Sequence, residues 1–227
     1  MQITEIYKSI QGESTYTGLP CVFVRLTGCN LRCSWCDTEY SFYGGKKMEP
    51  EEILAAVEQL SPEGGLVEFT GGEPLLQEQK LVPLMQQLLD SGYTVLIETS
   101  GERRLETVPK GVIKIVDVKC PGSGEEGCFR LENLEALGIH DEVKFVITGR
   151  NDYEFARDFV AQHALGIRVN AILFSPAFAK DAAGARDATH CIVDPRQLVE
   201  WMLEDNVPAR LGLQIHKFIW DPALKSV

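Results

Sequence analysis

The sequence predicts an α/β fold in which a parallel sheet is covered by helices. Short apolar segments rich in β-branched residues alternate with amphipathic segments along most of the chain, as in repeated strand–helix units. Polar residues gather where several of these strands end, which is where barrel-like α/β enzymes carry their sites. With 227 residues the chain can bury one substantial core, so we expect a single domain over residues 1–227.

The first half of the chain gives strands and helices in a clear order. Residues 2–8 alternate loosely and predict an edge strand, and residues 20–27 form a β-branched and aromatic run that predicts the next strand. On that second strand, alternation puts Val22, Val24 and Leu26 on one face and Cys21, Phe23 and Arg25 on the other. A helix over 50–60 begins at a proline, and a strand over 66–70 follows it.

The middle of the chain continues this pattern with less helix. Residues 80–91 predict a helix with Pro83 in its first turn and Gly92 just past its end. Strands are predicted over 93–98 and 112–119. Only a short helix over 131–137 separates the latter from the next strand, at 142–148.

The last third predicts two helices and two strands. Asn151, with Glu154 three residues later, resembles a capping box that opens a helix ending near Leu165. A strand is expected over 167–174, and a helix from Asp194 to Leu203. Residues 211–216 predict the last strand, which would place Gln214 and His216 on one face.

Composition limits the partners and the compartment. No apolar run reaches the length of a membrane span, and the first residues lack the pattern of a secretion signal. Seven cysteines without such a signal indicate a reducing cytoplasm, so we expect a cytoplasmic protein. The net charge of −11 disfavours a nucleic-acid partner, because a phosphate backbone would be repelled.

Three cysteines spaced C-x3-C-x2-C directly follow the strand over 20–27. Cys29, Cys33 and Cys36 are close enough in sequence for their thiolates to share one inorganic cluster. Three ligands on a four-iron cluster leave one iron open for chemistry. A zinc site in a non-enzymatic adaptor is the alternative, but zinc prefers four ligands in paired C-x2-C units, and none of the other four cysteines forms such a pair.

The cysteine motif resembles that of the radical AdoMet (S-adenosylmethionine) superfamily. Thr70-Gly71-Gly72-Glu73-Pro74 is similar to the second motif of that superfamily and again follows an apolar strand. The resemblance implies a partial, abbreviated (β/α)6 barrel of the radical AdoMet type, a 4Fe-4S cluster on the three cysteines, and AdoMet bound to its fourth iron. Glu73 can accept a hydrogen bond from the ammonium group of AdoMet.

Three further stretches narrow the resemblance to the 7-carboxy-7-deazaguanine synthase family. They are residues 9–13 (SIQGE), residues 35–38 (WCDT) and residues 213–220 (LQIHKFIW). The resemblance implies a lyase of queuosine-type 7-deazapurine biosynthesis that turns 6-carboxy-5,6,7,8-tetrahydropterin into 7-carboxy-7-deazaguanine and ammonia. It also implies hydrogen abstraction at C6 and ring contraction, a magnesium ion, a homodimer, and an electron donor such as flavodoxin or ferredoxin.

The same resemblance assigns site residues. His216 is expected to be catalytic. The expected substrate-binding residues are Ile10, Gln11, Gly12, Glu13, Arg25, Thr70 and His216. The expected AdoMet-binding residues are Trp35, Gly72, Glu73, Ser100, Lys119 and Ser175. Thr38 would offer its hydroxyl to Mg²⁺, a hard ion that prefers oxygen ligands. Arginine suits a planar carboxylate, which the pterin carries.

Two features leave alternatives open. A glycyl-radical or ribonucleotide reductase activating enzyme carries the same two superfamily motifs but acts on a protein partner. Some shorter relatives end at a position matching Pro222, whereas this chain continues to Val227, so the role of the tail after Pro222 is not given by the resemblance.

Overall fold

One curved, mainly parallel sheet of nine strands organises the computed structural model, which describes residues 1–227. The strand order is β3-β1-β2-β4-β5-β6-β7-β8-β9. Neighbours from β2 to β9 pair in parallel, and β1 pairs antiparallel with both β2 and β3. The strands are β1 (Gln2–Ile10), β2 (Pro20–Leu26), β3 (Lys46–Lys47), β4 (Leu66–Gly71), β5 (Thr94–Thr99), β6 (Ile113–Asp117), β7 (Glu142–Ile147), β8 (Ala171–Pro176) and β9 (Arg210–Leu211).

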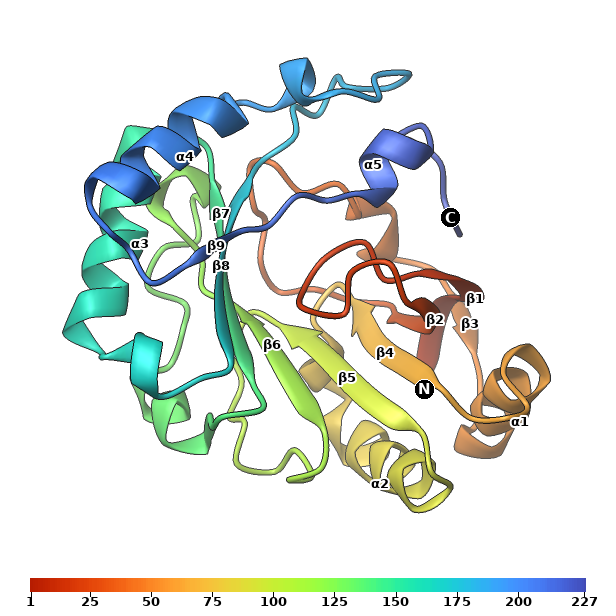
Figure 1. Ribbon diagram of the computed structural model, residues 1–227. Helices are drawn as coiled ribbons and strands as arrows, with labels where there is room; N and C mark the ends of the chain where they lie inside the picture. Colours follow the sequence, from red (N-terminus) through yellow and green to blue (C-terminus); the bar gives the residue numbers. More distant parts are fainter.

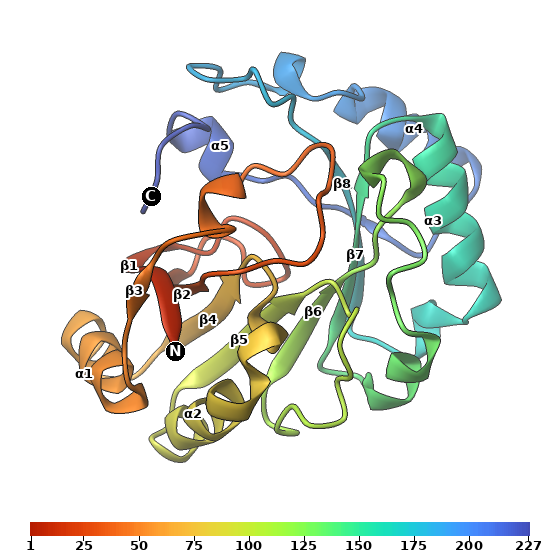
Figure 2. The ribbon, with the colours of Figure 1, turned by 180° about the vertical axis from the view of Figure 1, so that it is seen from behind.

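Four helices cover the outer side of the sheet. Figure 1 and the opposite view in Figure 2 show α1 and α2 beside β4 and β5, and α3 and α4 beside β7 and β8. The helices are α1 (Pro50–Leu60), α2 (Glu78–Asp90), α3 (Arg150–Gln162), α4 (Pro195–Glu204) and the short α5 (His216–Ile219). None of them combines the length and the apolar character that a bilayer crossing requires.

The barrel is partial and abbreviated, as predicted. The edge strands β3 and β9 do not pair with each other, so the sheet stays open. No helix connects β5 to β6, and only 3-10 turns, Pro121–Ser123 and Leu131–Ala136, lie between β6 and β7. The sequence predicts an ordinary short helix over 131–137. That prediction is wrong in type, since the segment is a 3-10 turn.

The alternation of side chains along the strands places one face of the sheet in the main core and the other face toward the interior of the partial barrel. Val22, Val24 and Leu26 of β2 are buried in the main core, which also contains the inward faces of the outer helices. The opposite face of β2 carries Cys21 and Phe23, as the alternation predicts. These two belong to a smaller apolar cluster together with Leu66, Leu96 and Ile115. This cluster, called the floor below, lies on the inner side of the sheet, and polar residues follow it toward the carboxyl ends of the strands.

The structure corrects two predictions in the first half of the chain. β1 is not the edge strand, because the two-residue β3 pairs on its other side. Pro83 lies inside α2 and not in its first turn, because α2 begins at Glu78, directly after a 3-10 turn over Pro74–Gln77.

Three predictions in the last third are also wrong. Asn151 does not cap α3: Gly149 occupies that position without a side-chain bond, and the Asp152 carboxylate accepts from the Thr148 and Gly122 amides instead. β8 starts at Ala171, because a 3-10 turn over Leu165–Ile167 precedes it. The last strand comprises only Arg210–Leu211, and His216 begins α5 rather than ending a strand.

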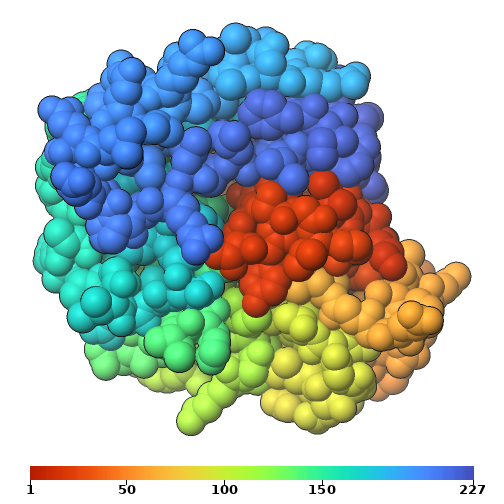
Figure 3. Space-filling model, viewed as in Figure 1, coloured from red at the N-terminus to blue at the C-terminus, as the bar shows by residue number.

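The two ends of the chain meet on the inner side of the sheet. Figure 3 shows the N-terminal residues in red directly beside the C-terminal residues in blue. The Ile215 amide donates to the Gly12 carbonyl oxygen over 2.9 Å, and Gln214 Nε2 donates to Glu13 over 2.9 Å. The chain leaves the sheet at Gly212 to make these contacts, which explains why the predicted strand over 211–216 stops early.

Candidate active site

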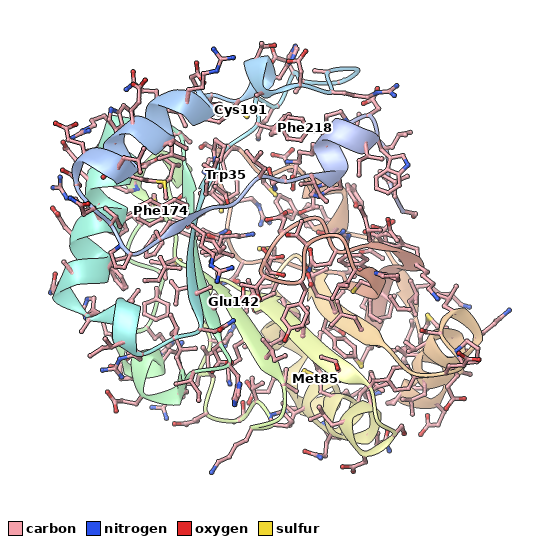
Figure 4. All side chains as sticks on the ribbon, in the orientation of Figure 1. Trp35, Met85, Glu142, Phe174, Cys191 and Phe218 are labelled. Atoms are coloured by element: carbon pink, nitrogen blue, oxygen red, sulfur yellow. The ribbon has the colours of Figure 1, made fainter.

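A single pocket at the carboxyl ends of the strands contains nearly all of the expected site residues. Its lining includes Ile10, Gln11, Gly12, Glu13, Arg25, Cys29, Cys33, Trp35, Cys36, Thr38, Thr70, Gly72, Glu73, Ser100, Lys119 and His216. Ser175 is the exception: it is buried on β8 and does not line the pocket. Figure 4 shows Trp35 near the middle of the molecule, whereas Met85, a buried residue of α2, lies lower in the view.

The three cysteines lie in a well-braced loop after β2. Arg32 donates to the carbonyl oxygens of Cys29 (2.8 Å) and Leu31 (2.6 Å), and its guanidinium lies 4.4 Å from the Phe42 ring centroid. The Ser34 amide donates to the Ser123 carbonyl oxygen in the loop after β6. These contacts hold the loop in place without using the three cysteine side chains.

The cysteines fit a cluster better than a single ion. Cys29, Cys33 and Cys36 all face the pocket, but no three His, Cys, Asp or Glu side chains come close enough together to hold one metal ion. A four-iron cluster takes each thiolate on a different iron, so it requires three thiolates around a common space rather than around a common point. Burial raises the pKa of the Cys33 thiol to about 12, so iron must displace a proton there.

Gly72 brings the Gly-Gly-Glu-Pro turn against the cysteine loop. A Cβ at this position would overlap the Gly28 carbonyl oxygen and lie 2.8 Å from Cys29 Cβ. The Glu73 amide also donates to the Gly28 oxygen over 2.8 Å. The glycine therefore permits a close approach between two segments of the chain.

Glu73 is a fully bonded, buried carboxylate. It accepts from the Thr99 hydroxyl at 2.7 Å, from the Ser100 hydroxyl at 2.7 Å, from the Ser100 amide at 2.9 Å and from the Leu75 amide at 3.1 Å. These bonds orient the carboxylate at the edge of the pocket, where it can still attract an ammonium group. Ser100 thus contributes through Glu73 as well as by lining the pocket.

Trp35 and Asp117 each leave a buried polar atom without a partner. Trp35 Nε1 and Asp117 Oδ1 form no hydrogen bond within the protein. Lys119 connects the two residues, because its Nζ lies 4.7 Å from the Trp35 ring centroid and 2.7 Å from Asp117 Oδ2. A free donor and a free acceptor beside the cysteines suit a bound molecule that offers both kinds of group, as AdoMet does.

Arg25 is partly engaged by its own chain. Its Nε donates to Glu5 over 2.7 Å and its Nη2 donates to the Tyr7 hydroxyl over 3.1 Å, which leaves Nη1 without a protein partner. Tyr40 also donates to Glu5, at 2.9 Å. Burial opposes the charge of Arg25, but these neighbours outweigh it and raise its pKa, so the guanidinium stays charged.

Glu13 belongs to a buried charge network that the sequence does not reveal. Lys144 of β7 donates to Glu13 over 2.9 Å and also to Glu98 of β5. Burial would raise the pKa of Glu13, but Lys144, His216 and Gln214 lower it to about 2, so Glu13 is ionised. The sequence pattern assigns no role to Lys144 or Glu68. The signal that marks them is a charged residue at an inward position of an otherwise apolar strand.

His216 is close-packed against the N-terminal loop. A Cβ on Gly12 would overlap its imidazole ring, so only glycine fits beneath it. Burial lowers the pKa of His216, so the ring is neutral at pH 7 and can both donate and accept a hydrogen bond. Neither ring nitrogen is bonded within the protein, although the residue lines the pocket.

Thr38 and the chain after Pro222 lie at the pocket edge. Thr38 Oγ1 lies 3.7 Å from Cys36 Sγ, and the neighbouring Asp37 pairs with the buried Lys217. Beyond Pro222, Ser226 donates to Glu5 over 2.7 Å and Lys225 Nζ lies 4.3 Å from the Tyr40 ring centroid. The tail therefore folds against the residues that hold Arg25.

Comparisons with known proteins all point to one superfamily. Residues 23–116 match the Radical SAM superfamily. A 7-carboxy-7-deazaguanine synthase of Koribacter versatilis is 66% identical over the full length of both chains, and one of Chlorobaculum tepidum is 39% identical over all of this chain and 97% of its own. The crystal structure of QueE from Escherichia coli superposes with a TM-score of 0.68 at 25% identity, covering 93% of this chain and 92% of QueE.

Proposed function

The chain belongs to the 7-carboxy-7-deazaguanine synthase family of radical SAM enzymes, and we propose that its central pocket is where the pterin substrate lies beside the cluster and AdoMet. The enzyme converts 6-carboxy-5,6,7,8-tetrahydropterin to 7-carboxy-7-deazaguanine with release of ammonia. Its cofactors are a 4Fe-4S cluster and AdoMet, which when bound supply the adenosyl radical that removes hydrogen from C6. An activating enzyme with a protein substrate is not favoured, because the relatives share one small-molecule activity.

One observation carries the assignment of the pocket. Cys29, Cys33 and Cys36 line the same cavity as Glu13, Arg25 and His216, and His216 reaches it from the opposite end of the chain. A radical formed at the cluster would therefore lie in the same cavity as the groups suited to a pterin. Such convergence positions the reacting atoms, which is the main task of the protein in this chemistry.

The cofactor half of the pocket uses the cysteine loop and the adjoining turns. The three cysteines hold the cluster. Glu73, oriented by Ser100, attracts the ammonium group of AdoMet, while the free Nε1 of Trp35 and the Lys119 ammonium face the same space. Gly72 contributes by letting the turn reach the loop. Ser175 lies outside the lining, so its contact with AdoMet has no support in the geometry.

The substrate half lies between the N-terminal loop and α5. Ionised Glu13 suits the amino-pyrimidinone edge of the pterin, which offers N–H donors, and Ile10, Gln11, Gly12 and Thr70 border the same space. Arg25 keeps Nη1 free for the substrate carboxylate. Neutral His216 can hold or move a proton at a ring nitrogen, which supports its catalytic role.

Several further features belong to the proposal. Thr38 offers its hydroxyl to a magnesium ion that orients the substrate carboxylate. The chain works as a single domain, since one continuous sheet spans it, and as a homodimer in the cytoplasm. A flavodoxin or ferredoxin supplies the electron.

The test uses anaerobically reconstituted enzyme with the carboxy-tetrahydropterin, AdoMet and a reductant, and detects the deazaguanine by mass. We expect Glu13→Ala and Arg25→Ala to lose turnover, because each removes a charged partner from a buried ligand, at a cost on the order of 2–5 kcal/mol. Slow reductant-driven cleavage of AdoMet without substrate should persist in both. Glu154→Ala and Arg150→Ala, an exposed ion pair on α3, serve as matched controls.

Full pterin turnover by the Glu13→Ala, Arg25→Ala double variant would contradict the substrate assignment. Loss of AdoMet cleavage together with cluster content would instead indicate that the variants disturb the fold. The slow cleavage reaction thus separates a substrate contact from general damage.

A further inference from the structure

Glu68 is a buried acid on the inner face of β4 that the family resemblance does not assign. It lies two residues before Thr70, and in the sheet it is adjacent to Phe23 of β2 and Leu96 of β5. Its side chain lines the pocket, and the residue is 2% exposed. Glu68 therefore borders the place proposed for the substrate, directly above the floor.

The carboxyl group of Glu68 has one free oxygen. Oε2 accepts from Gln11 Nε2, whereas Oε1 takes part in no hydrogen bond with the protein. On the floor side, Cys21, Phe23 and Leu96 offer no good hydrogen-bonding side chain. Because the floor offers no partner and Glu68 lines the pocket, Oε1 is free to bond to a molecule bound there.

The nearby cations are bonded to other acids. Lys144 donates to Glu13 and Glu98 but makes no hydrogen bond to Glu68. Arg25 pairs with Glu5. No cation therefore forms an ion pair with Glu68.

The remaining titratable neighbours also favour an uncharged carboxyl group. Burial, followed by repulsion from Glu98 and Glu13, raises the pKa of Glu68 well above its ordinary value, and the opposing effects of Lys144 and Arg25 are smaller. Glu68 itself contributes to the raised pKa values of Tyr7 and Cys21, so these two groups stay neutral around it. The raised pKa favours the protonated form of Glu68, which can donate a hydrogen bond.

We propose that Glu68 is a substrate-contacting residue that donates a hydrogen bond from its free oxygen to an acceptor atom of the fused pyrimidinone ring. The inference rests on the proposed function, because it takes the ligand to be a 2-amino-4-oxo heterocycle. Such a ring presents N–H donors beside acceptors, namely a carbonyl oxygen and an unprotonated ring nitrogen. Ionised Glu13 suits the donors, and a carboxylic acid suits the acceptors.

The test compares two substitutions at Glu68 in the reconstituted enzyme with AdoMet bound. Glu68→Gln keeps the shape and an N–H donor, whereas Glu68→Leu removes the donor. The readouts are the Kd of the product 7-carboxy-7-deazaguanine by calorimetry, the KM of the pterin, the cluster content, and slow AdoMet cleavage without substrate. Glu142→Gln is the matched control, because Glu142 is a fully buried acid that does not line the pocket.

We expect Glu68→Gln to keep Kd and KM within about threefold of the wild type, and Glu68→Leu to raise both at least about tenfold, on the scale of one lost buried hydrogen bond. Cluster content and slow cleavage should match the wild type in both variants. As the pH rises and Glu68 loses its proton, the wild-type Kd should increase, while that of Glu68→Gln should increase less.

Three results would overturn the inference. One is product binding by Glu68→Leu that equals the wild type. Another is an equal loss in Glu68→Gln and Glu68→Leu with the cluster retained, since it would mean that Glu68 acts as an ionised acceptor. The third is a parallel pH dependence in wild type and Glu68→Gln. Failure of the wild type itself to bind product or turn over the pterin would instead overturn the proposed function.

Discussion

At the residue scale, two cations in the pocket each contact more than one acidic or hydroxyl group. Lys144 serves Glu13 and Glu98 together, and Arg25 divides its nitrogens between Glu5 and Tyr7. Each shared cation holds its partners in place before a ligand arrives. Because these side chains are already ordered, substrate binding costs less conformational entropy. Only selected atoms, such as Arg25 Nη1, remain free to bond to the substrate.

Thr38 gives a residue-scale prediction about magnesium. Thr38→Ala should raise the magnesium concentration needed for half-maximal turnover, because it removes an oxygen ligand, while cluster content stays unchanged. Thr107→Ala, at an exposed threonine far along the chain, is the control. The measurement is a magnesium titration of pterin turnover, and identical titrations for Thr38→Ala and wild type would contradict the role.

The motif residues could be predicted from the sequence, whereas their partners could not. The spacing of Cys29, Cys33 and Cys36 by itself indicates a cluster-binding motif. Lys144 lies in an ordinary strand segment. Its role in the site depends on its ion pair with Glu13, which lies 131 positions earlier in the sequence. A contact over that distance depends on the order of strands in the sheet, which local pattern does not encode.

At the scale of elements, the turn after β4 determines how the cysteine loop sits. Gly71 and Gly72 allow this turn to pack against the end of β2 and the start of the cysteine loop, and a side chain at either position would overlap backbone atoms there. The turn then continues directly into the 3-10 segment Pro74–Gln77. The positions of the cluster and of Glu73 are consequently coupled.

Gly72→Ala tests this coupling. The added methyl would overlap the Gly28 carbonyl oxygen, so the cysteine loop must shift, and we expect cluster content after reconstitution to fall severalfold. Gly138→Ala is the control, because a Cβ there meets nothing within 4 Å. Iron and sulfide analysis with the visible absorption spectrum gives the readout. Full cluster content in Gly72→Ala would show that the loop can move without loss.

Most elements followed from hydrophobic pattern, and the exceptions have physical causes. α1 was predicted with its observed ends because a proline begins it and its apolar spacing is regular. Residues 211–216 alternate like a strand, but β8 offers β9 only two paired positions, at Leu173 and Phe174. The rest of the segment bonds to Gly12 and Glu13 instead, so tertiary contacts override the local pattern.

At the scale of the whole molecule, buried acids with opposite pKa shifts make stability depend on pH in two directions. Glu13 has a folded pKa of about 2, below its ordinary 4.5, so its contribution is present above pH 4.5 and is lost as pH falls toward 2. The pKa values of Glu68 and Glu98 are raised. Their contributions are present below pH 4.5 and are lost as pH rises through the raised values.

Urea unfolding of the cluster-free protein as a function of pH checks these signs. Between pH 5 and 3 the wild type should lose roughly 2 kcal/mol through Glu13, because the folded pKa of about 2 lies well below the ordinary 4.5. Glu13→Gln should lose less over the same range. Exposed Glu154→Gln should follow the wild type. If the free energy of unfolding changed with pH equally in Glu13→Gln and wild type, the lowered pKa assigned to Glu13 would be contradicted.

The meeting of the two chain ends has a consequence for how the protein is made on the ribosome. Lys217 follows its partner Asp37 by 180 residues, and Gln214 follows Glu13 by 201. At bacterial-type elongation of about 5–20 residues per second, the cysteines precede the segment that packs beside them by roughly 9–36 s. During that interval the nascent thiols lack the C-terminal segment beside them, so they are more open to oxidants and to iron than in the folded protein.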